Sequence, residues 1–380
     1  MNKKLVALAL SAVAAGMASA QTANVTLYGI VDTYLATERT GSGVVPAAGT
    51  VAARSVAAVS TTLVNGGGLS GSRWGLRGSE SLGGGMNAIF TLEGGFACDT
   101  GALGQGGLLF GRRAFVGLNG GFGTITLGRD YSPNFFVMCN SDDPFGGCLT
   151  SFSAVTSMGG YFANTLRQNN QVKYSTPSFG GLTVSGAWSL GEVAGCASAG
   201  RTIGGAVEYK NGPIYVGVGF SDNKNGVAPY SGEFAGLAAT AAPGSVSSKQ
   251  FIFGAAYNFG VAYAGVTYMV NKNYAGVKTK PLIGSVTVPF GAARVGLQLA
   301  QSKRDGGAKQ TSIGLLGEYD LSKRTELYGA YVQCKNKGLA CAADNGTATF
   351  AGGVPISGPS TATLTNQTAS VFALGVKHKF

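Results

Sequence analysis

The sequence VTLYGIVD, at residues 25–32, indicates the fold class because apolar and polar side chains alternate along it. Val25, Leu27 and Val31 share one parity, whereas Asp32 lies on the other. A period of two is that of a β-strand whose two faces meet different surroundings. Similar alternation recurs along the chain as far as VFALGVKHKF, which ends it at Phe380. This repetition predicts an all-β chain of many strands.

The composition excludes several other classes of protein. Charged residues make up 12% of the chain and hydrophobic residues 45%, which does not fit a disordered tail. Gly accounts for 63 of 380 residues and Pro for 11, so a Pro-rich linker or collagen does not fit either. A helical bundle is disfavoured, because Gly inside a helix costs about 1 kcal/mol per position.

The first twenty residues have the pattern of a secretory signal peptide. Lys3 and Lys4 precede an apolar stretch, and residues 18–20 are Ala-Ser-Ala, a small-x-small cleavage pattern. The alternative is an N-terminal membrane anchor, but residues 5–20 are a short span for a bilayer core of about 30 Å. No later run of 18 apolar residues exists. The exported chain is therefore either soluble or spans a membrane as strands, because only helices and closed barrels satisfy the backbone in lipid.

Short and long connections alternate along the mature chain. We expect seven short turns that contain Gly, Asn, Asp or Pro, and eight longer Gly-, Ser- and Ala-rich loops. The long loops are expected at residues 37–71, 97–107, 130–168, 191–200, 222–248, 272–280, 303–309 and 334–368. Seven turns and eight loops connect sixteen strands. An even strand number with short turns on one rim and long loops on the other is typical of outer-membrane barrels.

The sequence therefore predicts an all-β fold, a 16-stranded antiparallel transmembrane β-barrel that occupies residues 21–380 as one domain. A barrel of this width encloses a water-filled lumen. A secreted β-sandwich or β-solenoid also alternates with period two, but such folds seldom require this regular change from short to long connections.

Catalytic chemistry finds no support in the residue types. A Ser-His-Asp triad needs a histidine, and the single histidine, His378, lies on the apolar parity near the C-terminus. One histidine with scattered cysteines does not form a zinc site, and the Gly-rich stretches lack the Lys-Ser/Thr of a phosphate-binding loop. We expect no enzymatic activity, no metal and no cofactor.

The basic residues are more informative. Lys and Arg exceed Asp and Glu by 28 − 17 = +11, or by +9 without the two lysines of residues 1–20. They are dispersed along the strands, which argues against nucleic acid as a partner. A charge on the lipid face near the bilayer midplane costs about 2–4 kcal/mol, so basic residues on the polar parity should face the lumen. These are Arg73, Arg77, Lys173 and Arg294. Of two adjacent arginines, we place Arg112 inward and Arg113 near a rim or a bulge.

Several segments together resemble the general porins of Gram-negative bacteria, of the beta-proteobacterial kind. They are VTLYGIVD at 25–32, GSRWGLRGSESLGGG at 71–85, FGRRAFVGLNGGFGTITLG at 110–128, the segment 171–181, and GVKHKF at 375–380. In this order the motifs are specific and cover essentially the whole mature chain. The resemblance implies an outer-membrane homotrimer of 16-stranded barrels. It also implies that the third loop, about residues 130–168, folds inward as a constriction.

In the porin family, arginines of the wall face acidic residues of the third loop. Position by position, the resemblance places these arginines at Arg73, Arg112 and Arg167. The family's Pro-acidic-Phe-Gly-Gly motif falls on residues 143–147, where proline occupies the acidic position and the carboxylates move to Asp142 and Asp143. The sequence leaves open which of these acids reaches the constriction. Secondary candidates for the lumen are Arg77, Arg129, Lys173 and Arg294.

The expected function is passive diffusion of small hydrophilic solutes and ions through a water-filled channel that prefers anions, because rings of charged side chains set pore selectivity. Expected partners are outer-membrane lipid and lipopolysaccharide, small anions and polar solutes. One alternative is a channel specific for an anion such as phosphate or a carboxylate. Another is a secreted β adhesin without a pore.

The six cysteines all lie in or beside expected long loops, and an even number in an exported chain suggests disulfides. Proximity favours Cys139 with Cys148 and Cys334 with Cys341. Cys98 and Cys196 then remain, either paired across loops or as free thiols.

Overall fold

The computed structural model describes residues 24–40, 43–45, 54–56, 58–142, 166–224, 242, 244–274, 276–337 and 368–380. Among these residues, no helix is long and apolar enough to cross a membrane. The regular structure consists of strands, with one helix of ten residues, α2 (Pro133–Asp142), in the described part of the chain.

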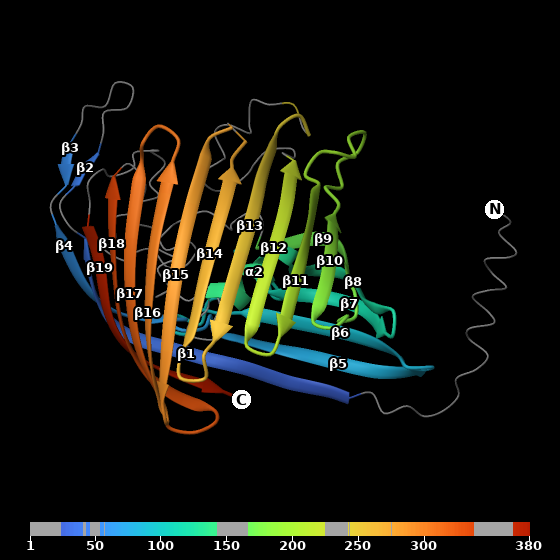
Figure 1. Ribbon diagram of the computed structural model, residues 1–380, viewed down its shortest axis with the longest axis horizontal. Helices are drawn as coiled ribbons and strands as arrows, with labels where there is room; N and C mark the ends of the chain where they lie inside the picture. Colours follow the sequence, from blue (N-terminus) through green and yellow to red (C-terminus); the bar gives the residue numbers. More distant parts are fainter. Residues whose placement is uncertain are drawn as a thin grey trace, which may run out of the picture.

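Strands of about ten residues follow one another along the chain (Figure 1). The first half contains β1 (Asn24–Thr40), β4 (Val59–Gly66), β5 (Arg73–Gly83), β6 (Met86–Gly95), β7 (Arg113–Gly120), β8 (Gly123–Tyr131), β9 (Arg167–Ser175) and β10 (Leu182–Ser189). The second half contains β11 (Thr202–Asn211), β12 (Ile214–Lys224), β13 (Ser247–Asn258), β14 (Tyr263–Lys272), β15 (Lys278–Phe290), β16 (Ala293–Arg304), β17 (Lys309–Asp320), β18 (Thr325–Lys337) and β19 (Thr368–Lys379). Two short strands, β2 (Gly43–Val45) and β3 (Arg54–Val56), pair separately.

The first and last strands close the sheet into a barrel. One edge of β1 pairs antiparallel with β19, from Ile30 opposite Lys379 to Thr40 opposite Ala369. The other edge pairs first with β5 and then with β4, so these two are parts of one barrel strand interrupted at residues 67–72. The sheet contains 17 strand segments, and counting β4 and β5 as one gives 17 − 1 = 16. The predicted 16-stranded antiparallel barrel is confirmed.

Some predicted connections were too long. The expected loop 37–71 contains the end of β1 and all of β4, because this strand is rich in Ser and Thr and ends in an irregular Gly-rich segment. The expected long loops 272–280 and 303–309 are hairpin connections at residues 273–277 and 305–308, since the flanking strands extend further than expected. The number and order of connections are unaffected.

The two faces of the barrel differ as the alternation predicts. Large apolar side chains on the outer face are exposed, for example Leu27 at 60% and Leu374 at 56%. Residues on the opposite parity, including Asp32 and Lys377, are buried. An apolar outer face matches the low cost of such side chains in lipid.

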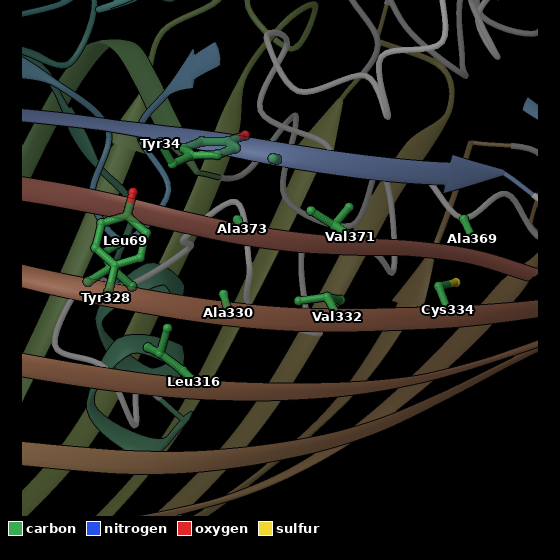
Figure 2. Close-up of a cluster of buried hydrophobic side chains, with 11 residues drawn as sticks. Tyr34, Leu69, Leu316, Tyr328, Ala330, Val332, Cys334, Ala369, Val371 and Ala373 are labelled. Atoms are coloured by element: carbon green, nitrogen blue, oxygen red, sulfur yellow. The ribbon is translucent and has the colours of Figure 1, made fainter. Parts of the chain in front are cut away.

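The inner wall of β17–β19 and β1 carries a cluster of buried apolar side chains (Figure 2). Its members include Tyr34, Leu316, Tyr328, Val332 and Val371. The 67–72 segment contributes Leu69, which is fully buried against this wall. The interruption between β4 and β5 is therefore folded towards the inner face.

Candidate functional site

Helix α2 follows β8 directly and lies on the inner face of the opposite wall. Its first residue is Pro133, whose fixed φ and missing N–H suit the first position of a helix. The helix contacts β11, β12, β13 and β14 (Figure 1). Glycines make room for it: a Cβ on Gly254 would lie 2.3 Å from Ser141 Oγ, and a Cβ on Gly219 would lie 2.4 Å from Asn134 Oδ1.

Polar contacts fix α2 along this glycine-lined wall. Asn134 Nδ2 donates to Gln250 Oε1 at 3.0 Å, and the hydroxyl of Tyr263 donates to the carbonyl of Asn140 at 2.6 Å. The hydroxyls of Ser141 and Thr267 are 2.6 Å apart. Between these contacts the helix buries apolar side chains against the wall, namely Val137 and Met138 against Ile252, Met269 and Ile283.

Tyr131, the last residue of β8, is an acceptor shared by two arginines. Its hydroxyl accepts from Arg112 Nη2 at 2.9 Å and from Arg167 Nη2 at 2.7 Å. The Arg167 guanidinium lies 4.5 Å from the Tyr131 ring centroid, within cation–π range. The Tyr131 ring also stacks on Phe135 of α2, with centroids 4.1 Å apart. Tyr131 therefore joins the wall arginines to the helix.

Glu93 of β6 is a carboxylate in direct contact with these arginines. It accepts from Arg112 Nε at 2.7 Å and from the hydroxyl of Tyr28 at 2.9 Å. Tyr28 reaches across Gly75 of the intervening strand, where a Cβ would lie 2.9 Å from the phenol oxygen. Any larger residue at position 75 would separate the phenol from its acceptor.

Asp130 of β8 is the second carboxylate of the site. It accepts two bonds from Arg113, at 2.7 and 3.2 Å, and is also ion-paired with Lys173. The Lys173 ammonium lies 5.3 Å from the ring centroid of Phe136 in α2. Two cations thus share one carboxylate at the start of the helix.

Arg73 completes the group of charges. Its Nε donates to the carbonyl of Gly71 at 2.9 Å, and it interacts electrostatically with Arg112, Arg167, Tyr131 and Glu93. We call five cations and two carboxylates the basic cluster: Arg73, Arg112, Arg113, Arg167, Lys173, Glu93 and Asp130. Among the described residues its formal charge is 5 − 2 = +3. Rings of charge of this kind set ion selectivity in pores.

The structure brings together the three arginines predicted for the pore wall, together with Lys173. The placement of the adjacent arginines differs from the expectation. Arg113 is opposite Glu93 on the inner face of β7, whereas Arg112 precedes the strand and reaches the same side. Both arginines point inward, because alternation applies only within the strand, which begins at Arg113. The expectation of Arg113 near a rim or bulge was wrong.

The remaining basic candidates lie outside the basic cluster. Arg77 is on the inner face of β5, with its guanidinium 5.2 Å from the Tyr28 ring centroid. Arg129 is opposite Ala114, on the outward parity, and donates to the carbonyl of Gly111 at 2.8 Å. It borders the cluster through an electrostatic interaction with Arg167.

Arg294 belongs to a separate network on β16–β19. It donates to Glu318 at 2.7 Å and to Glu326 at 3.2 Å, and lies 3.4 Å from Asp320. Glu326 also pairs with Lys377 at 3.0 Å and with Lys379 at 2.8 Å. Three cations meet three carboxylates, so this network has no excess of positive charge.

The acids that contact the arginines were not found from the sequence. Asp142 is the last residue of α2, and Asp143 lies outside the described residues, so their predicted role remains a prediction. Among the described residues, Glu93 and Asp130 are the carboxylates that contact the cations of the basic cluster. Both acids lie on the polar parity of their strands, next to strands that carry the basic residues. The sequence alone does not give the strand register that brings them into contact with the arginines.

The cysteines fall into two classes. Cys139 and Cys334 are disulfide-bonded, and their partners lie outside the described residues, so the pairs with Cys148 and Cys341 stay predictions. Cys98 and Cys196 are thiols outside any disulfide, so they do not form the expected pair across loops. His378 contacts the hydroxyl of Thr325 at 2.9 Å. Within the described ranges, no group of three or more His, Cys, Asp or Glu residues could hold a metal.

A small polar pocket of about 10 Å³ lies where α2 begins. Four of the residues that line it have buried side-chain polar atoms without a hydrogen-bond partner, namely Ser132, Asn134, Gln171 and Ser189. A space of this size with several polar atoms suits one water molecule, so we refer to it as the polar pocket.

Comparisons with known proteins agree with this architecture. The family described as Gram-negative porin matches residues 7–339. Outer membrane porin protein 32 of Delftia acidovorans is 35% identical over 372 residues, covering 93% of this chain and 95% of the relative. An outer membrane porin protein of Bordetella pertussis is 32% identical over 382 residues, with 88% of this chain and 95% of the relative covered.

Solved structures give the same result. The anion-selective porin from Comamonas acidovorans has a TM-score of 0.70 at 29% identity, over 94% of this chain and 100% of that chain. OmpT of Vibrio cholerae, at 15% identity and a TM-score of 0.64 over 94% of this chain and 100% of that chain, shares the fold. With a family match across most of its length and relatives that align along the whole barrel, this chain belongs to the Gram-negative porin family and is an outer-membrane porin.

Proposed function

We propose that the channel of this porin prefers anions and that the basic cluster at the start of α2 is its selectivity region. The observation that carries the proposal is the formal charge of +3 among the described residues of the cluster. The similarity to a porin described as anion-selective points in the same direction.

The mechanism is passive. Low-dielectric walls focus the field of the cluster into the lumen, which raises the local concentration of anions and lowers that of cations. One uncompensated charge about 5 Å from a permeating ion contributes roughly 0.8 kcal/mol in water. Screening at about 0.1 M salt reduces this to roughly 0.5 kcal/mol, a factor of about two in the permeability of each ion. Because the charge favours anions and disfavours cations, the ratio of their permeabilities changes by about fivefold. Small polar solutes diffuse through the same opening without a binding step.

The constriction loop, the assembly and the cellular context are part of the proposal. Residues 130–168 fold into the lumen, with Asp142 and Asp143 opposite the arginines, and the position of α2 on the inner wall supports this arrangement. The porin forms a homotrimer in contact with outer-membrane lipid and lipopolysaccharide, residues 1–20 are removed as a signal peptide, and the channel catalyses no reaction. A heat-labile oligomer on gels and a mature N-terminus at Gln21 are the expected results.

Reversal potentials across a planar bilayer with a potassium chloride gradient test the selectivity. We expect chloride to be preferred, and Arg73→Ala, Arg112→Ala and Arg167→Ala each to lower the chloride-to-potassium permeability ratio by about fivefold. Arg39→Ala is the matched control, because Arg39 is exposed on the outward parity of β1. Wild-type protein without chloride preference, or three lumen variants that behave like the control, would refute the proposal.

A further inference from the structure

The interruption between β4 and β5 is folded around the backbone of Asp32. Gly67, at φ +81°, turns the chain out of the strand, and its N–H donates to the carbonyl of Asp32 at 2.9 Å. At the other end, Ser72 Oγ accepts from Asp32 N and donates to Asp32 O, both at 3.0 Å. A regular strand would pair both ends directly with β1, so these contacts replace ladder bonds over residues 67–72.

The carboxylate of Asp32 binds the middle of the same segment. Oδ1 accepts from Gly68 N at 3.1 Å, and Oδ2 accepts from Leu69 N at 2.9 Å and Ser70 N at 2.7 Å. Successive backbone N–H groups around one anion form a nest. The hydroxyl of Tyr328, from β18, adds a fourth bond at 2.6 Å, and Asp32 is fully buried.

The far end of the segment leads to the basic cluster. The carbonyl of Gly71 accepts from Arg73 Nε at 2.9 Å. A Cβ on Gly71 would lie 3.2 Å from Arg112 Nη1, so the Gly71 backbone also borders that guanidinium. The carbonyl of Ser72 accepts from Phe96 N at 3.1 Å, which ties the segment to the chain after β6.

We infer that Asp32 is a positioning residue for ion selectivity: its nest-bound carboxylate holds the 67–72 segment in the shape that directs the guanidinium groups of Arg73 and Arg112. The inference deepens the proposed function and rests on it. Asp32 acts through the backbone of Gly71 and not by contact with a permeating ion, because its carboxylate is buried and fully engaged with backbone and phenol donors.

The sign of the selectivity change separates this role from a simple charge effect. If Asp32 acted only through its negative charge, its removal would make the lumen more positive and raise the preference for chloride. If it positions the arginines, its removal releases the segment, and the preference for chloride falls. The two explanations therefore predict opposite shifts of the reversal potential.

The experiment measures reversal potentials of Asp32→Asn and Asp32→Glu in the full-length, assembled porin. Asp32→Asn removes the charge and places an amide donor against backbone donors. Asp32→Glu keeps the charge but adds one methylene to a filled nest. We expect both to lower the chloride-to-potassium permeability ratio, by up to about fivefold for Asp32→Glu, the value for loss of one guanidinium, and by less for Asp32→Asn, which also removes a negative charge. Glu38→Gln is the matched control, because Glu38 is a buried carboxylate on the same face of β1, away from the segment.

Each result has a defined reading. A rise in chloride preference for Asp32→Asn, with no change for Asp32→Glu, would overturn the inference in favour of a charge effect. If Asp32→Asn does not assemble as a heat-labile oligomer, Ser72→Ala removes only the hydroxyl that binds the Asp32 backbone, and a fall in the ratio is again expected. An unchanged ratio in Ser72→Ala and Asp32→Glu would also overturn it. Failure of the proposed function is distinguishable, because Arg73→Ala would then have no effect either.

Discussion

Gly265→Ala tests whether α2 is seated on the inner wall. Gly265 lies on β14, and a Cβ there would be 1.8 Å from the carbonyl oxygen of Ser141, near the end of the helix. Carbon atoms do not approach closer than about 3.0 Å in such contacts, so the helix must move by at least 3.0 − 1.8 = 1.2 Å. Because the clashing atom belongs to the backbone, a change of rotamer does not relieve the contact.

The size of the effect follows from the contacts that this shift disturbs. Overpacking of a filled site costs about 1–3 kcal/mol. The bonds from Ser141 to Thr267 and from Tyr263 to Asn140 both lie at this end of the helix, and each contributes about 1 kcal/mol. The gain from replacing glycine, about 0.4–1 kcal/mol, offsets part of this loss. We expect the free energy of unfolding to fall by about 2–4 kcal/mol.

Denaturant titration of the barrel refolded into lipid vesicles, followed by tryptophan fluorescence, measures this change. Gly284→Ala is the matched control, since it lies on the neighbouring strand and its Cβ would be 4.0 Å from the nearest atom. The control should stay within about 0.5 kcal/mol of wild type. If Gly265→Ala is as stable as Gly284→Ala, α2 does not rest on β14 and the arrangement of the helix is wrong.

Three further outcomes are expected. Tyr131→Phe removes the oxygen that Arg112 and Arg167 share, which should lower the free energy of unfolding by about 1.5–3 kcal/mol; a stability equal to wild type would exclude the shared acceptor. Alkylation of the unreduced, denatured porin followed by mass spectrometry should modify Cys98 and Cys196 but neither disulfide-bonded cysteine, and the opposite pattern would contradict the assignment. A high-resolution crystal structure should contain one ordered water in the polar pocket, and an empty pocket would leave its polar atoms unexplained.

The barrel could be predicted because its two faces meet such different surroundings. Leu27 and Leu374 face outward and Asp32 and Lys377 inward, as the alternation indicated, since lipid excludes charge from one parity. The same rule missed β4, where Ser and Thr weaken the contrast between parities. Strands were thus predictable where hydrophobic patterning was strong, and the errors lay in the predicted lengths of the connections.

The site was predictable only in part, because its contacts depend on register. Alternation assigned Arg73 and Lys173 to the lumen, and the structure places both there. It gave no reason to join Tyr28 to Glu93, which meet across the glycine of an intervening strand. It also could not show that the alternation rule does not apply to Arg112, because this residue precedes the strand.

The pairing within the basic cluster determines which cations carry its excess charge. Arg112 is matched by Glu93, and one carboxylate, Asp130, serves two further cations. Arg73 donates to a backbone carbonyl and Arg167 to a phenol, and in the described part of the chain neither forms a direct ion pair with a carboxylate, although Arg73 lies near Glu93. Because a neutral acceptor orients a guanidinium without cancelling its charge, these two arginines contribute +2 of the cluster's +3. The geometry therefore assigns the largest share of the field to the arginines that have neutral acceptors, and the segment held by Asp32 directs one of them.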